Sequence, residues 1–85
     1  MQVLNLSGTS EMVSNAAYNP EDATLYLTYH SGNTVIAYQN VAAALFEELG
    51  RSPYPDVCIR FKIQANHSFQ RLVDNQLFYD YKMIK

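Results

Sequence analysis

The chain has 85 residues, of which 48% are hydrophobic and only 16% are charged. This length is enough for one domain over residues 1–85 and excludes two. The composition excludes a disordered chain, and a single cysteine excludes an internal disulfide bond. No stretch approaches the roughly 18 apolar residues of a membrane span, and the first residues lack the features of a signal peptide. We therefore expect a cytoplasmic protein that does not enter a membrane.

The net charge of −2 conceals an asymmetry between the two halves of the chain. Residues 1–50 contain five acidic residues and no lysine or arginine, which gives −5, whereas residues 51–85 contain six basic and three acidic residues, which gives +3. A basic half can indicate an anionic partner. Alternatively, the two halves neutralise each other within one fold or between subunits.

The first half of the chain predicts an antiparallel meander of three strands. Residues 12–18 read as a strand, which ends at a turn where Pro20 follows an asparagine. Residues 24–30 alternate apolar and polar side chains, and residues 34–39 are equally rich in β-formers. The Ser-Gly-Asn sequence between them is typical of a hairpin loop.

A helix is predicted over residues 41–49. Asn40 is a good N-cap residue, and Gly50 can adopt the left-handed conformation that ends a helix. Apolar residues recur every four positions, which favours packing of this helix on one face of the sheet. The Ser-Pro-Tyr-Pro sequence that follows, at residues 52–55, argues against regular structure.

Two later segments are ambiguous. Residues 57–63 alternate apolar and polar side chains as a strand does, yet Ile59 and Ile63 are also one helical turn apart. Residues 76–84 carry apolar residues on both faces, and we expect this segment either to cover the sheet or to pair with another subunit. The candidate oligomer contacts in it are Leu77, Tyr79, Tyr81 and Met83.

Several short motifs occur in an order that resembles the KTSC domain family, a module found at the C-terminus of some lysyl-tRNA synthetases. They are Ser14-Asn15 ahead of Tyr18-Asn-Pro-Glu, then Thr24-Leu-Tyr-Leu, Ser31-Gly-Asn-Thr, Tyr38, the 41–49 helix, Phe69 and Leu72. The resemblance covers residues 14–72 and leaves residues 73–85 as a C-terminal extension. Stand-alone members resembling this chain occur in bacteria and phages.

The resemblance implies an α+β fold, in which the meander, a C-terminal strand, the main helix and a short second helix pack together. It favours a short helix over residues 58–64 and a strand near residues 67–72. The chain departs from the family pattern where Arg60 stands in place of an asparagine and His67 in place of a tyrosine. A function that depends on those polar residues is therefore not implied.

We expect no catalytic residue, no metal site and no cofactor. The histidines and the single cysteine lack the paired spacing of metal ligands. Cys58 lies between Val57 and Ile59, which is typical of a buried and unreactive thiol.

Basic and aromatic residues are interleaved near the end of the predicted domain, where Phe61 and Phe69 stand among basic side chains. Such a pattern suits a nucleotide or a single-stranded nucleic acid, although the acidic net charge argues against nucleic acid. The alternative is that the aromatic residues belong to the core, with solvated charges between them. The candidate ligand-binding residues are Tyr54, Arg60, Lys62, His67, Phe69 and Arg71.

Size and resemblance together lead us to expect a small, non-enzymatic, homo-oligomeric binding protein encoded by a phage. It would capture a host protein or a small anionic ligand such as a nucleotide, and one use would be to inhibit host antiviral defence. The alternative is an RNA-binding accessory module.

Overall fold

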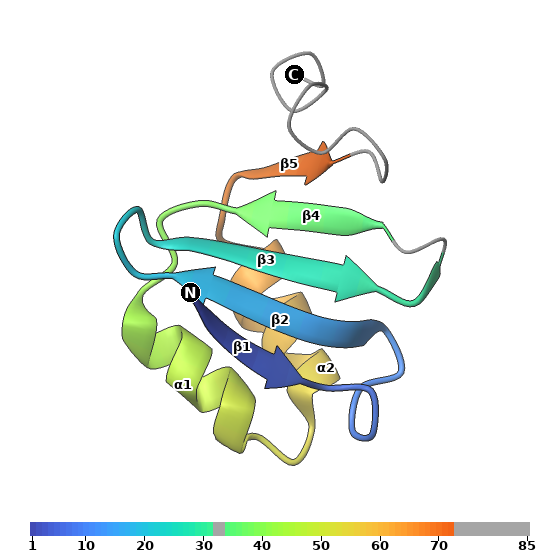
Figure 1. Cartoon of the computed structure of the whole chain (residues 1–85). Helices are drawn as coiled ribbons and strands as arrows, with labels where there is room; N and C mark the ends of the chain where they lie inside the picture. The colour runs from blue at the N-terminus through green and yellow to red at the C-terminus, as the bar shows by residue number, and fades with distance from the viewer. Residues whose placement is uncertain (32–33, 73–85) are drawn as a thin grey trace.

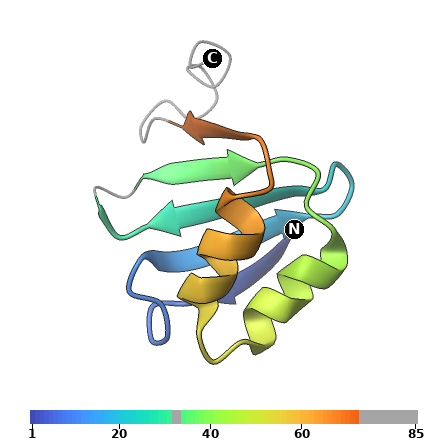
Figure 2. The same ribbon diagram turned by 180° about the vertical axis from the view of Figure 1, so that it is seen from behind.

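The computed structural model describes residues 1–31 and 34–72, in which a five-stranded antiparallel sheet has helices on one face (Figures 1 and 2). The strands lie side by side in chain order, and the helices are inserted between the fourth and the fifth strand. This is the α+β fold that the sequence predicts. The elements are β1 (Gln2–Asn5), β2 (Val13–Asn19), β3 (Thr24–Tyr29), β4 (Val35–Tyr38), α1 (Ala43–Arg51), α2 (Pro55–Cys58), η2 (Ile59–Gln64) and β5 (Phe69–Leu72).

The predicted meander is confirmed as β2, β3 and β4, with bounds that differ by one residue or so. The turn between β2 and β3 is held by side chains that cap nearby amides: Asn19 Oδ1 accepts from the Glu21 N–H at 3.0 Å, and Asp22 Oδ1 accepts from the Thr24 N–H at 3.2 Å. Short polar side chains of this kind stabilise tight turns.

Strand β1 was not predicted, because the sequence analysis placed the first strand at residue 12. Four residues are too few to show an alternating pattern, and pairing with β2 is what makes them a strand. Leu4 lies opposite Ala16 in that pairing.

The predicted helix exists but begins and ends two residues later than expected. Asn40 is not its N-cap, because this residue adopts a left-handed φ of 56° and the N-cap position belongs to Ala42, whose side chain makes no capping bond. The Val41 N–H donates to the Ala23 carbonyl at 2.8 Å, so Val41 is tied to the β2–β3 turn and the helix starts only after it. Gly50 lies inside α1 instead of ending it.

The ambiguous segment at residues 57–63 is helical, as the family resemblance implies, and its alternating pattern is misleading. Residues 52–54 are irregular, as expected, but Pro55 begins α2, a position where proline is well tolerated. The following turns form the π-helix η2, in which Ile59 and Ile63 are both buried. The predicted strand near residues 67–72 is confirmed as β5.

The core lies between the sheet and the helices (Figure 2). The Tyr18 ring stacks on Phe46 of α1 with ring centroids 5.1 Å apart, and its hydroxyl donates to the Val41 carbonyl at 2.6 Å. Cys58 is buried, as expected. The buried members of the core cluster are Leu6, Val13, Ala16, Tyr18, Leu25, Leu27, Tyr38, Val41, Phe46, Leu49, Cys58, Ile59 and Ile63.

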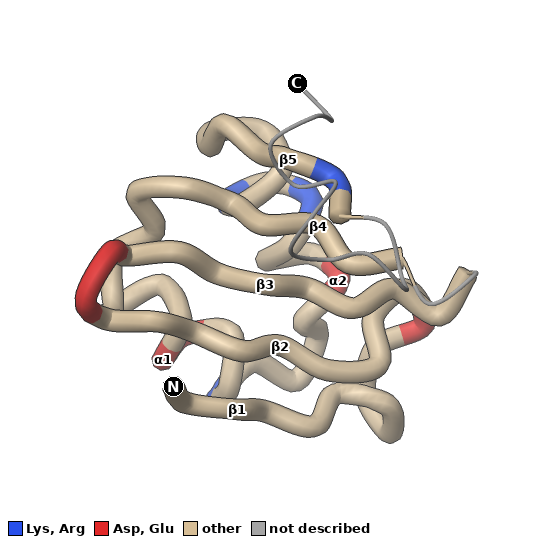
Figure 3. Tube along the Cα trace, turned by 45° about the horizontal axis from the view of Figure 1, so that its top comes forward, with Lys and Arg blue, Asp and Glu red and all other residues tan. Residues whose placement is uncertain are grey.

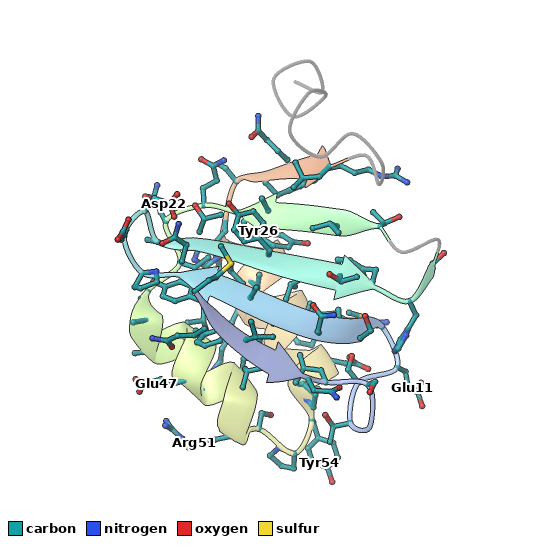
Figure 4. All side chains as sticks on the ribbon, in the orientation of Figure 1. Glu11, Asp22, Tyr26, Glu47, Arg51 and Tyr54 are labelled. Atoms are coloured by element: carbon teal, nitrogen blue, oxygen red, sulfur yellow. The ribbon has the colours of Figure 1, made fainter. Side chains whose placement is uncertain are left out.

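The opposite, outer face of the sheet carries no helix within the described residues (Figure 1). Register places Val3, Ala17, Tyr26, Ala37 and Gln70 in one row across it, and Figure 4 shows Tyr26 near its middle. The segment predicted to cover a sheet or to join subunits, with Leu77, Tyr79, Tyr81 and Met83, lies outside the described residues. No helix in the described part of the chain has the length and apolar character to cross a bilayer.

Candidate functional site

Ser10, Asp56 and His30 come together where the β1–β2 loop meets α2, but they do not form a catalytic triad. The Ser10 hydroxyl donates to Asp56 Oδ1 and accepts from the main-chain N–H groups of Met12 and Val13 at 3.1 and 2.9 Å. His30 Nε2 donates to the Ser10 carbonyl instead of its hydroxyl, at 3.4 Å. A nucleophilic serine needs a base on its hydroxyl, so this cluster fastens the loop to the helix.

A second polar cluster joins η2 to the sheet. The hydroxyls of Tyr29 and Tyr38 share a hydrogen bond of 2.8 Å, and Gln64 Nε2 donates to the Tyr29 hydroxyl at 2.9 Å. Burial of Tyr38, together with its bond to Tyr29, raises the pKa of its phenol far above the ordinary value. The ionised form of Tyr38 is therefore strongly disfavoured. The cluster is an uncharged hydrogen-bonded contact that holds η2 against the sheet.

The described surface includes two open hollows beside β1 and β3. One, of about 450 Å³, lies beside the end of β3 and is lined by Glu11, Met12, Tyr29, His30 and Ser31. The other, of about 520 Å³, lies on the outer face and is lined by Val3, Asn5, Ser7, Ser14, Asn15 and Ala17. Neither contains a predicted ligand-binding residue. Residues 1–31 and 34–72 also bring no three histidine, cysteine or acidic side chains close enough to hold a metal ion.

Three large apolar side chains project from the segment that contains α2 and η2. Tyr54 is 71% exposed, Val57 is 55% exposed and Phe61 is 68% exposed. Val57 and Phe61 are four residues apart in the helical segment and therefore share one face, and Tyr54 is the N-cap residue of α2, three residues before Val57. We call these three residues the helical strip. Figure 4 shows Tyr54 pointing away from the body of the protein at the start of this segment.

Basic residues flank the helical strip. Arg60 is exposed and makes no hydrogen bond or ion pair that involves another described side chain. Lys62 pairs with Glu48 of α1, which raises the pKa of the lysine. Arg71 reaches Thr34 Oγ1 at 3.5 Å. Figure 3 shows the basic positions of η2 and β5 on the β5 side of the molecule, away from the acidic β2–β3 turn.

His67 and Asn66 complete the end of the π-helix. The Asn66 side chain donates to the carbonyls of Phe61 and Lys62 at 3.2 and 3.4 Å, and His67 Nδ1 donates to the Ile63 carbonyl at 3.1 Å. The last carbonyls of a helix lack partners within it, so these side chains close η2. A predicted ligand-binding residue, His67, is thus engaged in a local structural bond.

Phe69 is 58% exposed although its ring centroid lies 5.7 Å from that of Tyr38. Register with β4 places Phe69 and Arg71 on the helix side of the sheet, because they lie opposite Tyr38 and Ile36. The sequence analysis left open whether Phe61 and Phe69 belong to the core or to a surface. Both are exposed.

The six predicted ligand-binding residues are therefore spread along the chain from Tyr54 to β5, and none of them lines either of these two hollows. Tyr54 belongs to the helical strip and Arg60 and Lys62 lie beside it, whereas Phe69 and Arg71 belong to β5. Sequence reasoning missed Val57, and it noted Phe61 among the interleaved aromatic residues without including it in the six candidates. Their spacing of four residues was the available signal.

No family model matches this chain, and no curated protein matches it at a significant level. The resemblance to the KTSC domain family therefore stays a prediction that depends on the motifs themselves.

Proposed function

We propose that this protein is a non-enzymatic binding protein that captures another protein through the helical strip. The observation that carries the proposal is the exposure of Tyr54, Val57 and Phe61, at 71%, 55% and 68%, within eight residues at the start of α2 and along the helical segment. Single exposed apolar residues are ordinary, but a contiguous group of large ones is characteristic of an interaction site.

The residue types also suit a protein partner. Aromatic residues and arginine are enriched at the centre of protein interfaces, and lysine is depleted there. Here Arg60 is exposed and the neighbouring lysine is already paired with Glu48. A partner that offers an apolar groove with a carboxylate at its rim would satisfy the strip and Arg60 together.

A π-helix is a rare element that often accompanies a functional site. In this chain η2 buries Ile59 and Ile63 while it presents Phe61 to solvent. Its end is closed by Asn66 and His67, so the strip is displayed on a supported segment. A preformed surface binds with a smaller loss of conformational freedom.

A small anionic ligand has less support. Such ligands bind in concave sites that bury most of their surface. Arg60, Lys62 and Arg71 do not line the hollows beside β1 and β3, and Lys62 and Arg71 already have partners. Inhibition of host antiviral defence through a captured host protein remains a hypothesis that comes from size and family resemblance.

The test is quantitative affinity capture from extract of the source cells. Wild-type protein is compared with the double variant Val57→Ser/Phe61→Ser. Truncation of a central interface residue typically costs about 2 kcal/mol or more, so we expect at least one specific protein to be depleted roughly thirtyfold with the variant.

The matched control is Val3→Ser, which changes another exposed apolar residue on β1, 68% exposed and far from the strip in the chain. The control should retain the same protein as wild type. Circular dichroism and thermal unfolding establish that all variants fold. Equal retention by wild type and by the double variant would refute the helical strip as the binding surface.

RNA binding is the second candidate function, because Phe61 and Phe69 are exposed next to Arg60 and Arg71. Aromatic stacking on bases with arginine on phosphates is the arrangement that single strands need. Titration with a fluorescent oligouridine distinguishes it, because contacts with several phosphates make affinity fall steeply with salt. Tight, salt-sensitive binding lost in Phe61→Ser/Phe69→Ser would favour RNA over a protein partner.

A further inference from the structure

The outward edge of β1 has main-chain groups that the described sheet does not use. The Leu6 N–H donates to the Ser14 carbonyl at 2.9 Å, and the same register continues through Leu4 with Ala16. Hydrogen-bonded residues alternate along an antiparallel pair. The N–H and C=O groups of Val3 and Asn5 therefore point away from β2, and among residues 1–31 and 34–72 no strand lies beyond β1.

Apart from its short length, this edge lacks the usual protection against strand pairing within residues 1–31 and 34–72. Edge strands are normally shielded by shortness, charged residues, proline, a bulge or a covering segment. Residues 1–10 contain no charged side chain and no proline, and the pairing of β1 with β2 has no register shift. An unprotected edge of this kind accepts an added strand.

The side chains of β1 differ on its two faces. Leu4 packs on the helix side, where its methyl groups approach Gly50 of α1 so closely that an added Cβ would lie 3.1 Å from them. On the outer face Met1 is 71% exposed and Val3 is 68% exposed. The open hollow of about 520 Å³ that Val3, Asn5 and Ala17 help to line is on the same face.

We propose that a second copy of this chain adds to the edge, β1 against β1 in antiparallel orientation, with Val3 opposite Val3. A two-fold axis through this pair makes the interface self-complementary. The two exposed valines then touch across the strands, which is a favourable cross-strand pair. Because β1 is uncharged, the strand does not repel its own copy.

The apolar contact between the two valines selects this register. With Val3 opposite Val3, the outward N–H and C=O groups of Asn5 pair with the main-chain groups of Met1 from the second copy. Shifting the register by two residues sets Val3 against Asn5 and Met1 against Ser7, whose N–H already donates to Asn5 Oδ1 at 3.0 Å. The shifted register would therefore separate the two valines, and its Ser7 N–H groups would not join the ladder.

The second copy also supplies a side chain to the hollow. Odd-numbered residues of β1 share the outer face, so Met1 of the second copy stands beside Asn5, which lines the hollow. Methionine is flexible and fills irregular apolar spaces well. The sheets of the two molecules become one continuous sheet, and the outer face gains an apolar patch centred on the two valines.

The contact is short, so the dimer is expected to be weak and concentration-dependent, in the class of small interfaces. It shares no residue with the helical strip. Failure of one proposal therefore leaves the other unaffected. Variants of Val3 test the β1 contact, and variants of Val57 and Phe61 test the helical strip. This surface is also distinct from the C-terminal segment that the sequence analysis selected as an oligomer contact.

The first test uses sedimentation of the full chain from micromolar to millimolar concentration. Val3→Pro removes an N–H that faces outward, so it blocks the added strand while the β1–β2 ladder stays intact. Val3→Lys places a charge at the same position. We expect each change to lower the association constant at least about tenfold.

Ala65→Lys is the matched control, because it introduces the same charge at an exposed residue that follows η2 and belongs neither to β1 nor to the helical strip. This variant should dimerise as wild type does. A wild-type chain that is monomeric at millimolar concentration, or a Val3→Pro variant that dimerises equally well, would overturn the proposal.

The second test fixes the register by disulfide formation in a Cys58→Ser background, which removes the only native thiol. Opposite residues in a hydrogen-bonded antiparallel pair have Cα atoms about 5.5 Å apart, within the range of a disulfide. Val3→Cys should therefore form a covalent dimer under mild oxidation. Asn5→Cys should not, because its counterpart is displaced by four residues, about 13 Å along the strand. Faster cross-linking of Asn5→Cys would contradict the register.

Discussion

Ser10 illustrates how a single short side chain connects distant parts of this chain. Its hydroxyl accepts from two main-chain N–H groups at the start of β2 and donates to Asp56 of α2, while Asp56 Oδ2 accepts from the Glu11 N–H at 3.0 Å. Ser10 is only 4% exposed. A buried polar group that loses its hydrogen-bond partner destabilises the folded state by its desolvation free energy. The contribution of Ser10 to stability therefore depends on all of these hydrogen bonds being present together.

Ser10→Ala should lower the free energy of unfolding by about 2 kcal/mol, because the Met12 and Val13 N–H groups lose their acceptor. The measurement is urea unfolding at neutral pH. Ser7→Ala is the control: Ser7 is exposed, and an exposed substitution of this kind should cost less than about 0.5 kcal/mol. Equal effects of the two changes would show that the Ser10 bonds contribute little.

Tyr38 gives the fold a predictable response to alkaline pH. Burial and the bond to Tyr29 raise the pKa of its phenol in the folded state, above the ordinary value of about 10 that applies to the unfolded chain. The neutral phenol is the form that folding favours. The stabilisation is therefore complete below about pH 10 and is lost as the pH rises toward the folded pKa.

Tyr38→Phe should remove this contribution. Between about pH 10 and 12 the free energy of unfolding of wild type should fall more steeply than that of the variant, by up to about 1.4 kcal/mol per pH unit. Parallel pH profiles for wild type and Tyr38→Phe would contradict the assignment.

At the scale of elements, α1 and β1 depend on each other through Gly50 and Leu4. A helix interior normally disfavours glycine by about 1 kcal/mol relative to alanine. Here a Cβ at position 50 would meet Leu4 Cδ1 at 3.1 Å, which is tighter than an ordinary van der Waals contact. Glycine allows the end of α1 to lie close under β1.

Gly50→Ala should therefore change the free energy of unfolding by less than about 1 kcal/mol, because better helix propensity and the contact with Leu4 oppose each other. In a Leu4→Ala background the contact is gone, and Gly50→Ala should stabilise by about 1 kcal/mol. Chemical denaturation of the four proteins forms a double-mutant cycle. Strict additivity would show that α1 and β1 do not meet at this point.

At the scale of the whole molecule, the two proposed contact surfaces lie on different elements. The helical strip runs from Tyr54 through α2 into η2, whereas β1 is at one end of the described strand order. Val3→Lys should weaken self-association at least about tenfold yet keep the captured protein, whereas Val57→Ser/Phe61→Ser should lose the captured protein yet keep self-association. Sedimentation and affinity capture on the same preparations measure both. Loss of both activities in either variant would show that the surfaces are coupled.

The C-terminal segment stays a separate prediction at this scale. A chain that ends at Asn75 lacks Leu77, Tyr79, Tyr81 and Met83, which the sequence analysis selected as oligomer contacts. Light scattering of this shortened chain should show weaker association than the full chain. Unchanged association would assign the whole contact to β1.

The sequence alone determined the meander, the main helix and the buried cysteine. These features depend on short-range physics: alternation in residues 24–30, turn residues between strands, and a four-residue apolar repeat in α1. Each is visible within about ten residues, so no knowledge of distant neighbours is needed. The helical state of residues 58–64 came from family resemblance, because their own pattern equally suits a strand.

Only the tertiary structure decided which apolar residues face solvent and which short segments join the sheet. β1 is a strand because β2 lies beside it, and Asn40 fails as a cap because Val41 is bound to Ala23. Phe61 and Phe69 are large apolar residues of the kind that usually form a core, but both are exposed. Phe61 is exposed because η2 directs Ile59 and Ile63 inward, and Phe69 because β5 is the last strand of the described sheet. Burial and pairing are relations between segments far apart in the chain, and a local pattern does not contain them.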